Sequence, residues 1–184
     1  GTILFTEDYE SGTVGENPDG WSVNYQYNFV ANPSATQYAD YIRVSSDNAY
    51  RGSNALYVDG RGLTSAMRYS TKEFTLPNGI ERVFVRYYMS SKEYIGNRVT
   101  NPDGSEPNHN HFMALEAGQN DEIRIGEVKG ALGMNEYGND DIVPKFEYWW
   151  GKIETKRIEA NTWVCVETAF LNDGDTPQLR TWID

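Results

Sequence analysis

The strongest constraint on the fold of this chain is an alternation of apolar and polar residues with a period of two, repeated in short runs. Residues 82–89, 122–128 and 146–154 alternate in this way. Such alternation is typical of a β-strand that buries one face and exposes the other. Shorter apolar runs predict further strands at 55–58, 66–69, 109–116, 163–170 and 179–183. No stretch has the apolar stripe of an amphipathic helix.

Clusters of turn-forming residues separate these runs. They are Asn17–Gly20, Pro77–Gly79, Asn101–Gly104 and Asn172–Asp175, and their Asn, Asp, Pro and Gly residues suit tight turns. Residues 38–50 are the least regular part, where we expect a loop with a short strand. Many short strands joined by turns predict an all-β sandwich or barrel. A length of 184 residues suits one domain spanning residues 1–184.

The net charge of −11 argues against several classes of partner. A nucleic-acid-binding surface needs basic residues to neutralise phosphates, and the chain has 16 Lys and Arg against 27 Asp and Glu. No apolar stretch is long enough to cross a membrane, and a single cysteine, Cys165, cannot form an intrachain disulfide. The chain begins at Gly1 and is interpreted as already processed, so we expect a secreted monomer without nucleic-acid or membrane partners.

The two histidines lie together as His109 and His111. On a strand they point to the same face, where they form either an ordinary polar pair or part of a site. With Glu116 they resemble the first metal-binding motif of the cupins, whose ligands suit a divalent transition metal. Cupins take another histidine from a second motif, which this sequence lacks. A metal-dependent, cupin-like or oxidative enzyme therefore remains one of three alternatives.

Arg124 is the clearest candidate for binding a carboxylate. It alternates with Ile123 and Ile125, so its guanidinium points away from the core. It forms either an ordinary cross-strand ion pair or a bidentate contact with a bound carboxylate. Glu122 and Glu127 face opposite ways on such a strand, which argues against a glycosidase with paired carboxylates. Polar faces on two other strands carry similar candidates for sugar binding, namely Arg86, Tyr88, Tyr148, Trp150 and Lys152.

Several segments, in this order, resemble the fungal cellulose-induced, glucuronan lyase-like proteins (polysaccharide lyase family 20). The segments are Asp8–Gly12, Tyr50–Val58, Val83–Tyr88, Asn110–Phe112, Ile123–Gly126, Trp163–Glu167 and Thr181–Ile183. The resemblance covers nearly the whole chain. It implies a β-jelly roll of two antiparallel sheets with a concave cleft, and two or more further strands after Asp184.

The resemblance also implies particular site residues. A structural Ca²⁺ would be bound by the Glu10 carboxylate, the Arg51 carbonyl and the region of Asn54, which are hard oxygen ligands. In the cleft, His111 and Arg124 match family residues, and Asp140 does so more loosely. Glu122 stands where the family has a second cleft histidine.

The chemistry that the resemblance implies is β-elimination on a polyuronate. Arg124 would neutralise the uronate carboxylate, His111 would remove the proton at C5, and Tyr148 would protonate the leaving oxygen. The expected function is that of a polysaccharide lyase or lyase-like protein of biomass degradation. A non-catalytic carbohydrate-binding module is the alternative from a different class.

Overall fold

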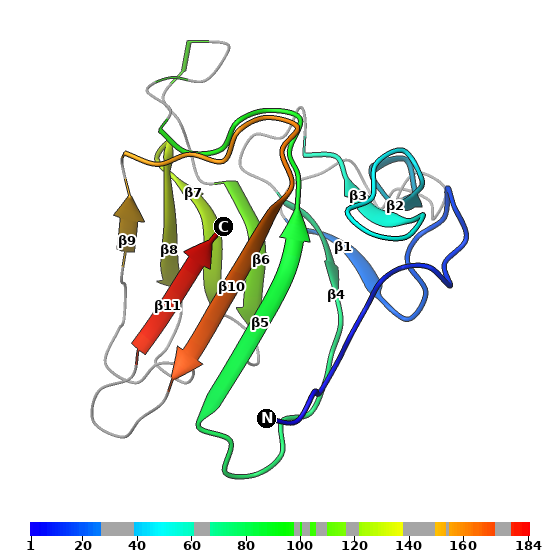
Figure 1. Ribbon diagram of the computed structural model, residues 1–184, viewed down its shortest axis with the longest axis horizontal. Coiled ribbons are helices and arrows are strands. Elements are labelled where there is room, and N and C mark those ends of the chain that lie inside the picture. The colour runs from blue at the N-terminus through cyan, green and yellow to red at the C-terminus, as the bar shows by residue number, and fades with distance from the viewer. Residues whose placement is uncertain are drawn as a thin grey trace. The chain divides into compact units, whose positions relative to one another are not determined.

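The computed structural model (Figure 1) describes residues 1–26, 39–60, 67–97, 100, 104–105, 110–116, 122–137, 150–153, 155–171 and 178–184. Within these ranges the chain is all-β and its sheets are antiparallel, which confirms the predicted fold class. Residues 39–41 form a single helical turn. The strands are β1 (Ser22–Gln26), β2 (Ile42–Ser45), β3 (Ala55–Val58), β4 (Met67–Thr71), β5 (Arg82–Met89), β6 (Asn110–Glu116), β7 (Glu122–Val128), β8 (Ala131–Tyr137), β9 (Trp150–Ile153), β10 (Val164–Leu171) and β11 (Gln178–Ile183).

The chain divides into two compact units, residues 1–79 and 80–184. The first unit holds two small sheets, β1–β4 and β2–β3. Its buried centre is β2, where Ile42 and Val44 are fully buried. The segment before β1 lies along β2, because Gly15 N donates to Val44 O at 2.9 Å and Val44 N donates to Glu16 O at 2.8 Å.

The second unit holds a three-stranded sheet, β11–β10–β5, and a four-stranded sheet, β6–β7–β8–β9. In Figure 1 the three-stranded sheet lies in front of the four-stranded one. Contacts between the described side chains of the two sheets include a hydrogen bond from Thr181 Oγ1 to Met134 Sδ at 2.8 Å and the ring pair of Tyr87 and Phe112, whose centroids lie 6.4 Å apart. The two sheets of this unit therefore pack face to face.

Alternation along the strands decides which residues fill the space between these sheets. On β10, Val166 and Thr168 are buried. On β7, Ile123 and Ile125 are 0% and 1% exposed. A cluster of Ile95, Leu132 and Ile158, with Met89, Phe112 and Val164 against it, closes one part of this core. Burial of these side chains is the main force that holds the two sheets together.

Strands with clean alternation were predicted within one or two residues. Residues 82–89, 122–128 and 55–58 match β5, β7 and β3, and the runs predicted near β4, β6, β10 and β11 also form strands. Of the run 146–154, β9 covers 150–153, and the rest lies outside the described residues. The expected short strand within 38–50 is β2. The jelly-roll arrangement and the single domain stay predictions.

Two strands were missed by the sequence analysis, β1 and β8. Strand β8 contains Gly133 and follows β7 after only two residues, Lys129 and Gly130. Both of these residues have positive φ, 46° and 78°, which is the geometry of a type I′ hairpin turn. A lysine rather than asparagine or aspartate precedes the glycine, so the usual signal of this turn is weak.

No helix in the described residues is both long enough and apolar enough to cross a membrane.

Gly126 allows β6 to approach β7 closely. The register of this pair shifts between His111 and Met113, which places a β-bulge at Phe112. A Cβ atom on Gly126 would collide with Asn110 O and lie 2.7 Å from His111 Cα. Both neighbours are backbone atoms, so a side chain at this position would push the two strands apart.

We predict that Gly126→Ala lowers the free energy of unfolding by about 2–4 kcal/mol, because the methyl group collides with fixed backbone. Chemical denaturation measures this loss. Gly60→Ala is the matched control, since nothing lies within 4 Å of a Cβ built there, and it should change stability by less than about 0.5 kcal/mol. Equal effects of the two variants would contradict the proposed close approach.

Tyr87 carries a buried hydroxyl between the two sheets. The oxygen finds no hydrogen-bond partner among the described residues, and burial raises the pKa of this phenol above its usual value. An unsatisfied buried hydroxyl destabilises the folded state. We therefore predict that Tyr87→Phe raises the free energy of unfolding by about 1 kcal/mol. A loss of stability in chemical denaturation would show instead that the hydroxyl is hydrogen-bonded.

Candidate functional site

Arg124 lies on the outer face of the four-stranded sheet. Its neighbours Ile123 and Ile125 point into the core and are almost completely buried, whereas Arg124 is half-buried. The register aligns Arg124 with Ala114 on β6 and with Asn135 on β8. Ala114 has a short side chain, which leaves room beside the guanidinium. The outward direction predicted for Arg124 is confirmed.

The bulge in β6 aligns position 111 with Gly126, which is on the same face of β7 as Arg124. His111 pairs with Gly126, two residues along β7 from Arg124, so the two positions are diagonal neighbours with Cα atoms about 7–8 Å apart. Phe112 and Met113 on the other side of the bulge both belong to the core-facing side. The His111 ring is half-buried and its Nε2 is shielded from solvent.

Three other predicted residues occupy positions on this outer face. Glu122 is two residues before Arg124 on β7. Trp150 aligns with Asn135, and Lys152 aligns with Gly133. By the alternation of strands these positions share a face with Arg124. We call this set of positions, 111, 114, 122, 124, 135, 150 and 152, the Arg124 face. Tyr148 and Asp140 lie outside the described residues, as does His109.

Arg86 and Tyr88 are not part of the Arg124 face. They lie on β5, in the other sheet of the sandwich, and alternate with Tyr87, whose ring packs inward against Phe112. Their side chains therefore lie on the opposite outer surface. Arg86 Nη2 and Nε donate to Glu167 Oε1 at 2.5 and 2.9 Å. This hydrogen bond and the charge of Glu167 raise the pKa of Arg86.

Glu127 and Glu122 occupy opposite faces of β7, as predicted from their five-residue spacing. Glu127 is only 2% exposed and accepts a hydrogen bond from Gly96 N at 3.0 Å. The buried carboxylate thus ties the segment around residue 96 to the four-stranded sheet. It is held within the sandwich, away from the Arg124 face.

Sequence reasoning missed two positions beside Arg124 and Glu122. Asn135 lies directly across from Arg124, and Tyr137 lies across from Glu122. Both belong to β8, the strand that was not predicted. A weak turn signal at Lys129 and Gly130 was the only local feature that could have revealed them.

Glu10 connects the N-terminal segment to the loop at residues 51–54. Its Oε1 accepts hydrogen bonds from the backbone N–H groups of Ser53 and Asn54 at 2.8 and 2.9 Å. Asn54 Nδ2 donates to Tyr9 O at 3.3 Å. Gly52 has a φ of +75°, and a Cβ there would collide with Glu10 Oε1, so glycine permits this close approach.

The calcium site stays a prediction. Glu10 contacts the backbone of Ser53 and Asn54, and its carboxylate is a hard oxygen ligand of the kind that Ca²⁺ binds. However, two N–H donors point at Oε1, so a cation would bind the second carboxylate oxygen. Among the residues that the structure describes, no cluster of three or more His, Cys, Asp or Glu could hold a metal ion.

The Arg124 face combines groups suited to an anionic sugar. A guanidinium can bind a carboxylate through two parallel hydrogen bonds, and an imidazole can take up or release a proton near neutral pH. His111 on β6 and Arg124 on β7 belong to one pair of strands, and the backbone hydrogen bonds of that pair fix the distance between the two positions. Rigid mounting of this kind is what binding and catalysis both require.

Comparisons with protein-family models and with curated proteins find no match to this chain. The resemblance to the glucuronan lyase-like family therefore stays a prediction.

Proposed function

We propose that the Arg124 face binds a uronate-containing polysaccharide and cleaves it by β-elimination. The observation that supports this proposal is the strand register, which pairs His111 with Gly126, two residues along β7 from Arg124. A uronate presents its carboxylate and the acidic C5 hydrogen on adjacent carbons. One cation and one base a short distance apart can therefore engage both groups of a single sugar.

In the proposed β-elimination, Arg124 and His111 act on the same uronate. Arg124 binds the carboxylate and stabilises the negative charge that develops on it when the C5 proton leaves. His111 accepts that proton. The electron pair of the C5–H bond forms the C4–C5 double bond, and the C4–oxygen bond breaks. The leaving oxygen then takes up a proton, for which Tyr148 is the proposed donor, with Glu122, Asp140, Trp150 and Lys152 as proposed contacts to the sugar chain.

The wider setting of this proposal is an extracellular protein of plant or algal biomass degradation. With a net charge of −11, the protein can bind an acidic polymer only where cationic residues face it, and the Arg124 face has two cationic positions, Arg124 and Lys152. A binding module without turnover is the second candidate for the same face. Binding without product formation would distinguish it from the lyase.

We predict that incubation with one of glucuronan, alginate or pectate produces the ultraviolet absorbance of an unsaturated uronate. Arg124→Ala should lower kcat/KM at least about 100-fold because it removes the group that stabilises the developing charge. His111→Ala should lower it about 100-fold or more because it removes the base.

The matched control for this assay is Arg157→Ala, which removes an exposed arginine paired with Glu159 and should leave the rate unchanged. If folded protein forms no unsaturated product from any of the three polymers, the lyase proposal is wrong. Loss of activity in all three variants alike would show a general defect rather than a role for Arg124.

We also propose that Ca²⁺ binds at Glu10. Addition of Ca²⁺ should then raise the Tm of the wild-type protein, since a ligand that binds only the folded state stabilises it. Glu10→Gln should abolish this increase, because the amide oxygen still accepts the two N–H groups but carries no charge. Mg²⁺ at equal ionic strength is the control. A Tm of the wild type that does not respond to Ca²⁺ would contradict the calcium proposal.

A further inference from the structure

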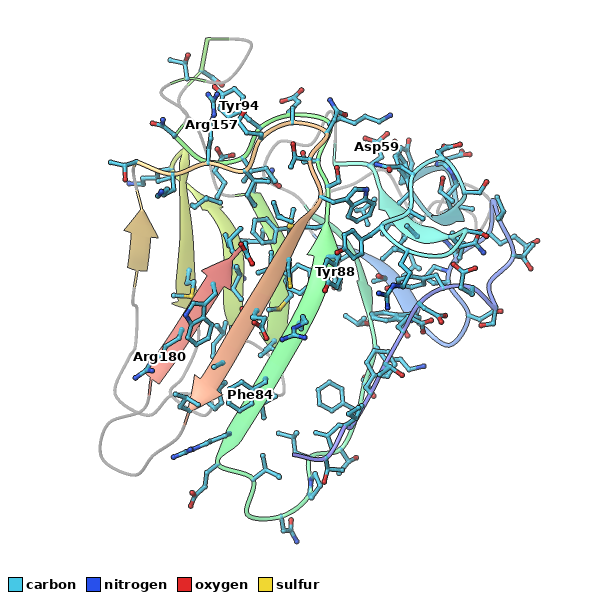
Figure 2. All side chains as sticks on the ribbon, in the orientation of Figure 1. Asp59, Phe84, Tyr88, Tyr94, Arg157 and Arg180 are labelled. Carbon is cyan, nitrogen blue, oxygen red and sulfur yellow. The ribbon has the colours of Figure 1, made fainter. Side chains whose placement is uncertain are left out.

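The outer face of the three-stranded sheet exposes an unusual set of aromatic residues. Phe84 is 70% exposed, Trp182 is 51% exposed and Tyr88 is 44% exposed. Strand alternation places all three on the surface that faces away from the four-stranded sheet. Figure 2 shows Phe84 and Tyr88 on β5 and Arg180 on β11, on the near side of this sheet. Single exposed apolar residues are ordinary, but three large rings on one small sheet face suggest a binding surface.

Arginine residues alternate with these rings. The register aligns Phe84, Ala169 and Arg180 in one row, and Arg86, Glu167 and Trp182 in the next. Ala169 is fully buried, so the larger side chains of its neighbours cover it. Phe84 and Trp182 therefore stand on the two strands that flank β10, one row apart. From strand geometry their Cα atoms are about 12 Å apart.

The charge on this face is opposite to that of the whole chain. Its strand positions carry three arginines, Arg82, Arg86 and Arg180, against one glutamate, Glu167. Asp184, which pairs with Cys165 in the row of Tyr88, adds a second carboxylate at the end of this face. Glu167 is paired with Arg86, whose side chain remains 61% exposed. That ion pair uses Nε and Nη2 of the guanidinium, and arginine has five N–H donors in all. In a protein with a net charge of −11, this local excess of cations favours an anionic occupant.

We propose that this outer face, defined by Phe84, Arg86, Tyr88, Glu167, Arg180 and Trp182 and named the Trp182 face, is a non-catalytic binding surface for an acidic polysaccharide. Aromatic rings cover the apolar faces of sugar rings at low cost in side-chain entropy. Guanidinium groups bind the sugar carboxylates. Phe84 and Trp182 are farther apart than the length of one sugar, so the surface binds a polysaccharide chain rather than a monosaccharide.

This site is separate from the Arg124 face, because the two lie on opposite outer surfaces of the same sandwich. It does not depend on the proposed lyase activity. Binding here would hold the protein on an anionic polymer whether or not the other face cleaves that polymer.

The test measures binding of the full chain to polygalacturonate and alginate by affinity electrophoresis, with neutral dextran as the control polymer. Trp182→Ala and Phe84→Ala should each weaken binding to the acidic polymers about tenfold, and the double variant should weaken it further. Arg180→Glu should also weaken it, and added salt should reduce the wild-type affinity. Phe74→Ala, which removes another half-exposed ring, is the matched control and should bind like the wild type.

The outcomes separate this inference from the proposed function. Unchanged binding in the Trp182→Ala and Phe84→Ala variants, with loss of binding in Arg124→Ala, would overturn the inference and leave the lyase proposal standing. Loss of binding in the Trp182 and Phe84 variants, with no turnover by the wild-type protein on any of the three polymers, would support the inference and overturn the lyase proposal. Concentration-dependent dimerisation of the wild type that Trp182→Ala abolishes, without polymer binding, would show that a second copy covers this face and would overturn the inference.

Discussion

The alternation of β7 is the constraint on which the candidate site depends. Ile123 and Ile125 are fully buried between the sheets of the second unit, and burial of two such side chains stabilises the fold by about 3–6 kcal/mol. A shift of the register by one residue would expose both and bury Arg124 in their place. The same apolar burial that stabilises the sandwich therefore fixes the direction of Arg124.

The β-bulge in β6 is the second determinant of the site. If β6 were a regular strand without a bulge, positions 111 and 114, three residues apart, would lie on opposite faces. The bulge brings both to the outer face and turns Phe112 toward the core, where it packs against Tyr87. Gly126 permits the necessary close approach of backbone. The position of His111 thus depends on a residue with no side chain.

Local features of this fold could be predicted from the sequence, whereas the pairing between distant strands could not. The strands at 82–89 and 122–128 and the outward direction of Arg124 follow from alternation alone, and they were predicted. Alternation does not tell whether Arg86 and Arg124 lie in the same sheet, because membership of a sheet depends on pairing between segments that are distant in the sequence. Strand β5 pairs with β10, which places Arg86 on the opposite outer surface. The bulge at Phe112 has no signal in the alternation, and β8 follows an atypical turn.

We propose that His111 and Arg124 form one site for a uronate, and because the chain has only two histidines, NMR can follow the imidazole of His111 directly. NMR spectra of the imidazole groups during titration with an oligouronate should show a saturable shift of the His111 signals. The same titration of Arg124→Ala should show no shift, because the carboxylate is no longer held beside the ring. If the His111 signals of the wild-type protein do not move while the oligouronate binds, His111 and Arg124 do not form one uronate site.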